Sequence, residues 1–221
     1  MMMLDSFPPQ IKSQLKLSDG LLLDLSGEGN VVTNYGATLT ADHRGRANKA
    51  WNIDGTDKID GLYNLSGATE FTVVIGIKPG NYIQYCHCNI YALGIYGSPD
   101  YFAIYLYQGR VVYVRFDVAS AASGVYQIGS VDTTIYNHIV VTFNGSLTGN
   151  DKFKLYINGS SAIIDKLVAT CTFTAVPNLL SPYLGKIYAS QSMAYFMDDY
   201  QVLSRALSQS EISQLYNEWR K

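Results

Sequence analysis

Between residues 21 and 202 the sequence is a succession of short runs in which apolar and polar residues alternate, separated by Gly, Asn, Ser and Asp. Successive side chains of an extended strand point to opposite faces, so this period of two is typical of strands with one buried face. The turn residues between the runs favour antiparallel neighbours joined by tight turns. The pattern therefore predicts an all-β fold.

Several runs separate their two faces clearly. In residues 71–77 the odd positions are large and apolar, and residues 139–143 and 153–157 show the same alternation. Residues 101–116 are predicted to form a hairpin that turns at Gln108-Gly109. Two antiparallel sheets packed face to face would bury one row from each run. The side chains expected to point inward are Phe71, Val73, Ile75, Ile77, Phe102, Ile104, Leu106, Val112, Val114, Phe116, Ile139, Val141, Phe143, Phe153, Leu155 and Ile157.

The length of the chain favours a single domain. Its 221 residues could hold two domains, but β-sandwiches of about 200–250 residues commonly form one. Hydrophobic residues make up 48% of the chain and charged residues 15%, a composition that can bury a large core. We expect residues 21–221 to form this domain. Residues 1–20, which contain Pro8 and Pro9, are expected to form an N-terminal arm that docks on a protein partner in a larger assembly.

The chain is predicted to end on its one clear helix. Ser208 is followed three residues later by Glu211, which is the spacing of a capping box. Apolar and aromatic side chains then recur at helical spacing, so one face of the helix should pack on the sandwich. These side chains are Ile212, Leu215, Tyr216 and Trp219.

Charge and hydropathy exclude several classes of partner. A net charge of −2 provides no field that would attract phosphates, so we expect no nucleic-acid partner. No run approaches the ~18 consecutive apolar residues of a membrane span, and the start lacks the pattern of a secretory signal.

The three cysteines, Cys86, Cys88 and Cys171, are too few for a disulfide framework. Cys86-His87-Cys88 within a strand cannot converge on a metal ion without distortion, because both sulfurs point to one face and the imidazole to the other. We expect the cysteines to be reduced, and a metal site or a disulfide is the alternative.

Five fragments in fixed order resemble the laminin G-like branch of the concanavalin A-like lectin/glucanase superfamily. The strongest are the D-x-S-G-x-G-N loop and the terminal segment that runs to Tyr216. This resemblance implies a concanavalin A-like jelly-roll sandwich with a short C-terminal helix, in a superfamily whose members bind sugars, mediate adhesion or act structurally. It also implies a structural hairpin at residues 53–59, where Ile53 replaces the usual Phe. The fragments are Asp24-Leu25-Ser26-Gly27-Glu28-Gly29-Asn30, Ile53-Asp54-Gly55, residues 137–145, residues 155–159 and Met197-Asp198-Asp199-Tyr200.

Asp24, Asn30 and Asp198 are the candidate metal ligands. Asp198 shares its strand parity with Tyr200 and Val202, so its carboxylate should turn inward with them. A buried carboxylate has to be compensated, and a structural calcium ion is a natural partner because it takes oxygen ligands. Relatives in the resembling family hold such an ion where the first and last strands meet. The alternative is that Asp24 and Asn30 only shape a Gly-rich turn while Asp198 accepts backbone hydrogen bonds.

A tyrosine-rich sheet face is the candidate ligand-binding surface. In the predicted hairpin, the face opposite the core carries Tyr105, Tyr107, Tyr113 and Arg115. Sugar rings pack their C–H faces on aromatic planes, and sugar hydroxyls pair with planar donors, so this face would suit a glycan. Tyrosine is also a good strand former and a common interface residue. Burial against a protein partner and a plain solvent-exposed face therefore remain alternatives.

The sequence offers no catalytic residues. Glucanases of the superfamily carry paired acids as E-x-D-x-x-E, whereas Glu28, Glu70, Glu211 and Glu218 do not have that arrangement. His138 lies in a strand position that is structural in the resembling family. We therefore expect a non-enzymatic recognition or adhesion module that binds carbohydrate or a cell-surface glycan.

Two settings for such a module follow from the missing export signal. The first is the surface of a phage virion, and an extracellular location by another route is the second. The alternative function is a structural or decoration protein of a capsid, tail or fibre that acts through protein–protein contacts.

Overall fold

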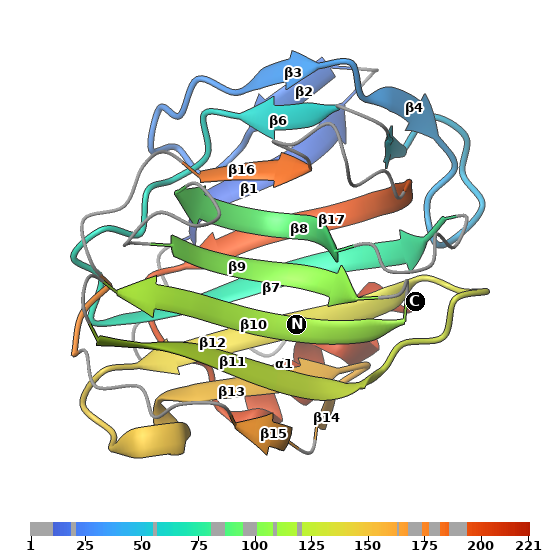
Figure 1. Cartoon of the computed structure of the whole chain (residues 1–221). Helices are drawn as coiled ribbons and strands as arrows, with labels where there is room; N and C mark the ends of the chain where they lie inside the picture. Colours follow the sequence, from blue (N-terminus) through green and yellow to red (C-terminus); the bar gives the residue numbers. More distant parts are fainter. Residues whose placement is uncertain are drawn as a thin grey trace.

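The computed structural model contains two antiparallel sheets packed face to face and one C-terminal helix (Figure 1). Every pairing between the described strands is antiparallel, so the predicted all-β sandwich is confirmed. The structure describes residues 11–18, 21–54, 57–80, 87–94, 101–107, 110–118, 121–162, 164–167, 174–176, 182–185 and 194–221.

The strands are divided between a first sheet of nine and a second sheet of eight. The first sheet contains, in order, β14 (Ser160–Ser161), β13 (Phe153–Ile157), β12 (Asn137–Asn144), β7 (Glu70–Pro79), β17 (Tyr195–Leu203), β1 (Ile11–Ser18) and β2 (Leu21–Asp24), with β5 (Ala50–Ile53) paired to β17 and β4 (Thr38–Thr40) paired to β5. The second sheet contains β15 (Ile164–Leu167), β11 (Ala121–Ser130), β10 (Val111–Val118), β9 (Tyr101–Tyr107), β8 (His87–Gly94), β16 (Pro182–Gly185), β6 (Lys58–Asp60) and β3 (Thr33–Tyr35).

One core fills the space between the sheets, and the predicted inward rows line it. The odd positions of residues 71–77 and 139–143 belong to this core together with the even positions of β9 and β10 that the structure describes. Phe71 of the first sheet meets Phe102 of the second edge to face, with ring centroids 5.6 Å apart. Phe143 and Phe153 extend this aromatic cluster. The side chain of Phe116 and the turn at Gln108-Gly109 lie outside the described residues.

The second half of the predicted arm is part of the sandwich. Ile11–Ser18 forms β1, which pairs with β17 on one side and with β2 on the other. Its sequence, Ile-Lys-Ser-Gln-Leu-Lys-Leu-Ser, shows a weak alternation, with apolar residues at positions 11, 15 and 17 and the polar Ser13 between them. Residues 1–10 and 19–20 of the predicted arm lie outside the described residues.

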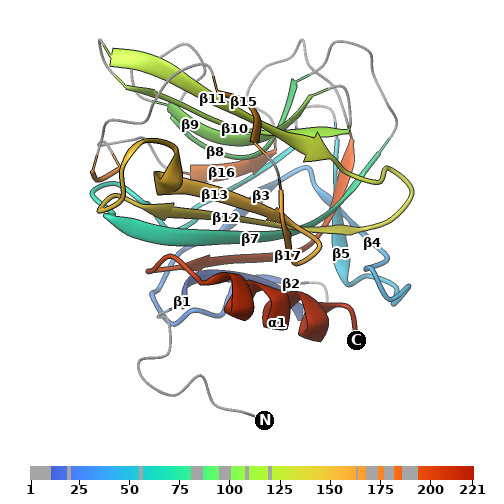
Figure 2. The same ribbon diagram turned by 90° about the horizontal axis from the view of Figure 1, so that it is seen from below.

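The α-helix α1 (Gln209–Trp219) lies against the outer side of the first sheet (Figure 2), and a short 3-10 helix (Gly149–Lys152) precedes β13. The predicted capping box is present, because the Ser208 side chain accepts from the Glu211 backbone and the Glu211 carboxylate accepts from the Ser208 backbone. Ile212 is fully buried against side chains of β7 and β12, namely Val74 and Val140. The helix therefore covers the outer face of β7 and β12 at these positions.

The turn between β13 and β14 holds α1 in place. Asn158 and Gly159 both have positive φ, 53° and 78°, as a two-residue hairpin turn requires. The Gly159 carbonyl accepts hydrogen bonds from Gln209 Nε2 at 2.7 Å and from Ser213 Oγ at 3.1 Å. A side chain at position 159 would meet the ring of Tyr216, so glycine also permits the close approach of the helix.

Replacing Phe71 by Ala is expected to cost about 3–5 kcal/mol of unfolding free energy, since a buried aromatic side chain leaves a cavity between the two sheets. Chemical denaturation of both proteins measures the difference. Lys154→Ala, on the exposed face of β13, should change the stability by less than about 0.5 kcal/mol. An effect of Phe71→Ala as small as that of the control would contradict the described core.

The contribution of Glu211 to stability is expected to depend on acid pH. The hydrogen bond from Arg205 lowers the pKa of Glu211 from 4.5 to about 2 in the folded chain, with help from Ser208. The folded state thus binds this proton less readily than the unfolded state, so the stabilisation is present above pH 4.5 and is lost as the pH falls towards 2. Glu211→Gln should flatten the stability profile in this window, whereas Glu218→Gln on the same helix should leave it unchanged.

Candidate functional site

A β-bulge in β17 shapes the first candidate site. Met197 pairs with Ile77 and Tyr200 pairs with Ile75, so Asp198 and Asp199 together oppose the single residue Gly76. A bulge of this kind breaks the alternation of side chains and can re-aim them. Met197 and Tyr200 accordingly both lie in the core. The sequence-based inference that Asp198 points inward with Tyr200 is therefore wrong, because the bulge intervenes between them.

Trp219, at the end of α1, packs over the bulge. A Cβ atom on Gly76 would lie 3.2 Å from the indole of Trp219 and 3.2 Å from the backbone nitrogen of Asp199. The absence of a side chain at Gly76 thus lets the indole rest on the sheet. On its other side the indole stacks on the ring of His43, with centroids 4.3 Å apart and planes 20° from parallel.

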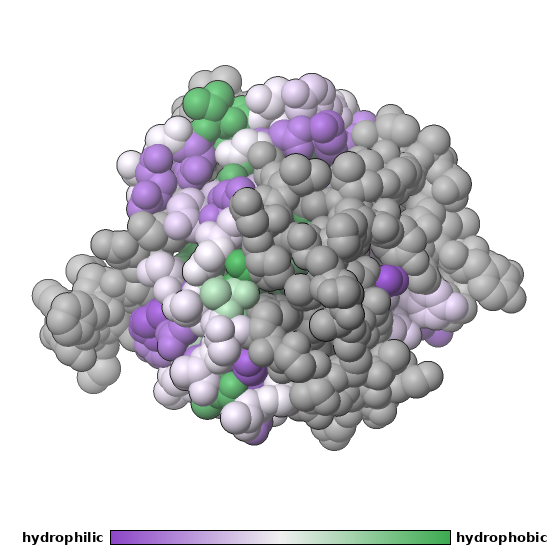
Figure 3. Space-filling view, turned by 60° about the vertical axis from the view of Figure 1, so that its left-hand side comes forward, coloured by the Kyte–Doolittle hydropathy of each residue, from purple (hydrophilic) through white to green (hydrophobic). Residues whose placement is uncertain are grey.

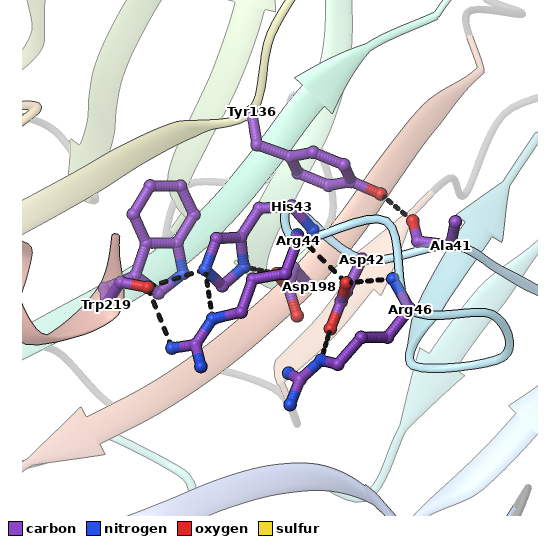
Figure 4. Close-up of polar contacts among 8 residues, drawn as sticks. All are labelled: Ala41, Asp42, His43, Arg44, Arg46, Tyr136, Asp198 and Trp219. Atoms are coloured by element: carbon purple, nitrogen blue, oxygen red, sulfur yellow. Dashed lines mark hydrogen bonds and ion pairs between the residues drawn. The ribbon is translucent and has the colours of Figure 1, made fainter. Parts of the chain in front are cut away.

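His43 joins three separate parts of the chain (Figure 4). Its Nδ1 contacts Oδ2 of Asp198, and its backbone nitrogen donates to the same carboxylate oxygen at 3.1 Å. Its Nε2 lies 2.6 Å from the backbone carbonyl oxygen of Trp219. The exposed side chain of Arg44 lies beside it and donates from Nη2 to that carbonyl at 3.1 Å. The loop of residues 41–46, strand β17 and the end of α1 are therefore tied together at one imidazole.

The loop that carries His43 is itself braced by a buried carboxylate. Asp42 accepts hydrogen bonds from the backbone nitrogens of Arg44 and Arg46 and from Arg46 Nε, at 2.9, 2.8 and 2.6 Å. Burial alone would raise the pKa of Asp42, but the hydrogen bonds from Arg46 and Arg44 outweigh it and lower the pKa. Tyr136 donates to the carbonyl of Ala41 at 2.6 Å.

His138 lies on β12 beside the same cluster. It pairs in register with Gly76, and its ring centroid is 5.3 Å from that of Trp219. Burial, together with the charge of nearby His43, lowers the pKa of His138 to about 4, so its ring is neutral at pH 7. His138 Nδ1 and Trp219 Nε1 have no hydrogen-bond partner among the described residues.

The predicted metal ligands are divided between two places. The Asp24 carboxylate accepts from the backbone and hydroxyl of Ser26 and from the side-chain amide of Asn30. Asp198 instead contacts His43, and strand β1 separates β2 from β17. The structure therefore brings Asp24 and Asn30 together in their turn and gives Asp198 another partner. A calcium ion bound by Asp24, Asn30 and Asp198 stays a prediction.

The predicted ligand-binding residues lie together on the outer face of the second sheet. Tyr105 and Tyr113 are cross-strand partners whose rings stack with centroids 5.1 Å apart and planes 7° from parallel. Tyr107 meets Tyr113 edge to face at 5.7 Å. Tyr105 is only 6% exposed, whereas Tyr107, Tyr113 and Arg115 are partly exposed. The solvent-exposed alternative is therefore wrong for Tyr105, whose ring stacks beside that of Tyr113.

A second row of polar aromatic contacts continues across the same face. The hydroxyl of Tyr101 donates to Asn89 Oδ1 at 3.0 Å, and Asn89 Nδ2 donates to the hydroxyl of Tyr183 at 3.3 Å. Tyr101 and Tyr183 are buried in a small cluster with Tyr105 that is separate from the main core. The packing of these rings holds the tyrosine surface in one arrangement. We refer to Tyr105, Tyr107, Tyr113 and Arg115 as the tyrosine face.

Sequence reasoning did not find that His43, Asp199 and Trp219 lie together with Asp198. His43 is 155 residues from Asp198 along the chain, and their contact follows only from the pairing of β5 with β17. Asp198-Asp199 within a predicted strand was the available signal, since two adjacent carboxylates cannot share one face of a regular strand.

The prediction for the cysteines lies outside the described residues. This holds for the side chains of Cys86 and Cys88 and for Cys171.

Comparisons with known proteins come from a family model and from solved structures. The model described as the concanavalin A-like lectin/glucanases superfamily matches residues 54–213. A comparison with curated protein sequences finds no match. Within the described part of the chain, no helix combines the length and apolar character needed to cross a bilayer.

Several of the similar solved structures are binding domains of botulinum neurotoxins. The serotype G binding domain is 14% identical with a TM-score of 0.74, covering 95% of this chain and 51% of that chain. A second structure has a description stating that cell entry of botulinum neurotoxin type C depends on interaction with two ganglioside molecules. It is 15% identical with a TM-score of 0.73, and the match covers 96% of this chain and 52% of that chain. The DC binding domain in complex with rat synaptotagmin II is 14% identical with a TM-score of 0.70, and the match covers 95% of this chain and 51% of that chain. This chain thus spans about half the length of these structures, and the likeness shows a shared fold.

Replacing His138 by Gln is expected to change how stability responds to mild acid. The pKa of His138 is about 4 in the folded chain and 6.5 when unperturbed, so the unfolded state takes up the proton first and stability falls as the pH drops through this interval. His138→Gln should make that fall shallower in denaturant unfolding across the same interval. An unchanged slope in a folded His138→Gln protein would contradict the burial of a neutral imidazole.

Proposed function

Since its family model matches residues 54–213, this chain belongs to the concanavalin A-like lectin/glucanases superfamily, and we propose that it is a non-catalytic module that binds carbohydrate or a cell-surface receptor. The observation that carries the proposal is the tyrosine face, in which a buried ring supports a parallel, partly exposed one. Rigid aromatic rings with a nearby guanidinium suit a ligand that has both C–H faces and polar groups.

The solved relatives support recognition as the general role. The type C neurotoxin is described as needing two gangliosides, and the DC domain is described in complex with synaptotagmin II. One of these ligands is a glycolipid and the other is a protein. Because fold and function separate in widespread folds, the ligand of this chain has to be argued from its own surface.

The tyrosine face favours a glycan over other ligands. Tyr113 is held from one side by Tyr105 and from another by Tyr107, so little side-chain entropy is lost when a ligand packs on it. Arg115 lies two residues along the same strand and has the same parity, which provides hydrogen-bond donors beside the rings. A sugar would use the ring for its C–H face and the guanidinium for its hydroxyl or acidic groups.

Two of the four glutamates, Glu211 and Glu218, make contacts that serve the helix. Glu211 is occupied by Arg205 and by the capping box of α1. Glu218 lies on the same helix and accepts from Gln214 at 3.1 Å. These contacts support the proposal of a binding module, because a retaining glycosidase needs two carboxyl groups facing each other across about 5–5.5 Å.

A structural role in a larger assembly is the second candidate. Val31 is 82% exposed, and Leu25 and Tyr35 in the neighbouring segment are about half exposed. The face drawn in Figure 3 shows small separate hydrophobic areas among polar and neutral ones. Apolar side chains on β3 and the loop before it would be covered if the chain packed against a capsid, tail or fibre subunit. A virion surface would accommodate either candidate function.

Replacing Tyr113 by Ala is expected to weaken glycan binding by about tenfold or more, since a well-packed aromatic anchor commonly contributes more than about 1.4 kcal/mol. A glycan array identifies the ligand, and calorimetry with that glycan measures the change. Tyr35→Ala, an exposed tyrosine at the opposite edge of the same sheet, serves as the matched control and should bind normally. A purified chain that binds no glycan but forms a stable oligomer or capsid complex would favour the structural candidate.

A further inference from the structure

Two buried polar atoms without a hydrogen-bond partner among the described residues lie beneath the end of α1. They are His138 Nδ1 and Trp219 Nε1, and the centroids of their rings are 5.3 Å apart. His138 is only 2% exposed. Gly76, which pairs with His138 in the sheet, has no side chain to separate the indole from the strands. Buried polar atoms in native proteins are nearly always paired, so these two atoms are expected to serve each other.

The two groups are chemically complementary at neutral pH. An indole N–H can only donate, whereas a neutral imidazole keeps one nitrogen that accepts. Burial, with a smaller effect of His43, lowers the pKa of His138 to about 4, so its ring is neutral at pH 7. A protonated imidazole donates from both nitrogens and has no acceptor left. Protonation of His138 would therefore place two donors beside each other in a buried position.

We propose that Trp219 Nε1 donates to His138 Nδ1, directly or through one water molecule, and that this link is an acid-released latch for the C-terminal end of α1. When the end of the helix lifts, the imidazole of His138 reaches water. The open state then binds a proton more readily than the latched state, so its population grows as the pH falls. The latch is independent of the tyrosine face, which lies on the other sheet.

The surroundings of His138 do not offset the burial of a charged ring. The titratable and charged side chains on the elements around it are His43, Arg44, Lys78, Tyr136, Asp198, Asp199 and Tyr216. Asp198 contacts His43, and Asp199 has a partner of its own. Among the described residues His138 forms no ion pair. Burial and the charge of His43 both disfavour the protonated ring in the latched state.

The N-terminal half of α1 has anchors that mild acid leaves in place. Ile212 is fully buried, and the Gly159 carbonyl accepts from Gln209 and Ser213. The pKa of Glu211 is about 2, so the carboxylate of the capping box stays ionised at pH 5. Release is therefore confined to the part of the helix that follows Ser213, and it would uncover the outer face of the first sheet around Gly76.

The two pKa values of His138 give the expected size of the effect. The value is about 4 in the latched state, and an imidazole in water has its ordinary value of 6.5. The population of the open state should then rise by more than about tenfold between pH 7 and pH 5. The gain levels off below pH 4, because the latched state also takes up the proton there.

Amide hydrogen exchange of the full-length chain, read residue by residue and corrected for its intrinsic pH dependence, measures this opening. Protection of residues 216–219 should fall by more than about tenfold from pH 7 to pH 5, while β7 and β12 keep theirs. In His138→Gln the side chain still accepts but does not titrate, so the protection should stay constant. Constant protection in the wild type would overturn the proposal, and so would a rise in acid, which a cation–π contact with the indole would produce.

The other two histidines of the chain provide matched controls. His87 lies on β8 of the second sheet, so His87→Gln should retain the full pH dependence. His43→Gln removes the other imidazole that contacts Trp219; it should lower the protection at both pH values but keep the fall between them. A fall that persists in folded His138→Gln, or that disappears in His43→Gln, would refute the assignment. If His138→Gln does not fold, the comparison of the wild type with His43→Gln decides between the two imidazoles.

Discussion

Burial of one face of each sheet against the other is the interaction on which the rest of this structure depends. Phe71 and Phe143 of the first sheet meet Phe102 of the second in an aromatic cluster, and alternate residues of β7, β9, β10 and β12 extend the core on both sides. Once these rows face inward, the remaining side chains of the same strands have to face outward. Each sheet therefore has an outer surface whose use is decided by what packs on it.

The two outer surfaces are used differently. On the first sheet, α1 covers Val74 and Val140, and its end places Trp219 over Gly76. On the second sheet, tyrosines of β9, β10 and β16 pack against one another, and Tyr107, Tyr113 and Arg115 remain partly accessible. The tyrosine face and the contacts of His43 thus lie on opposite sides of the core. The direct contacts of His43 join residues 41–46, β17 and the end of α1.

A single local irregularity creates the cluster at His43. In a regular strand, Asp198 and Asp199 would point to opposite faces, and one of the carboxylates would enter the core. The bulge opposite Gly76 keeps Met197 and Tyr200 in the core and releases both acids from it. The missing side chain at Gly76 also leaves room for the indole of Trp219, and the backbone carbonyl of Trp219 lies next to Nε2 of His43.

The sequence by itself determined the all-β class, the inward rows of residues 71–77 and 139–143, the hairpin of β9 and β10, and the capping box at Ser208, because each of these follows from neighbours within one segment. Only the tertiary structure decided that residues 11–18 join the sheet, that Tyr105 is buried beside Tyr113, and that Asp198 meets His43. Periodicity tells which side of a strand a residue occupies. It carries no information on which distant segment covers that side, or on where a bulge changes which alternate residues face the core. Those features depend on contacts between residues far apart in the chain, and such contacts stabilise the structure only once the whole core has formed.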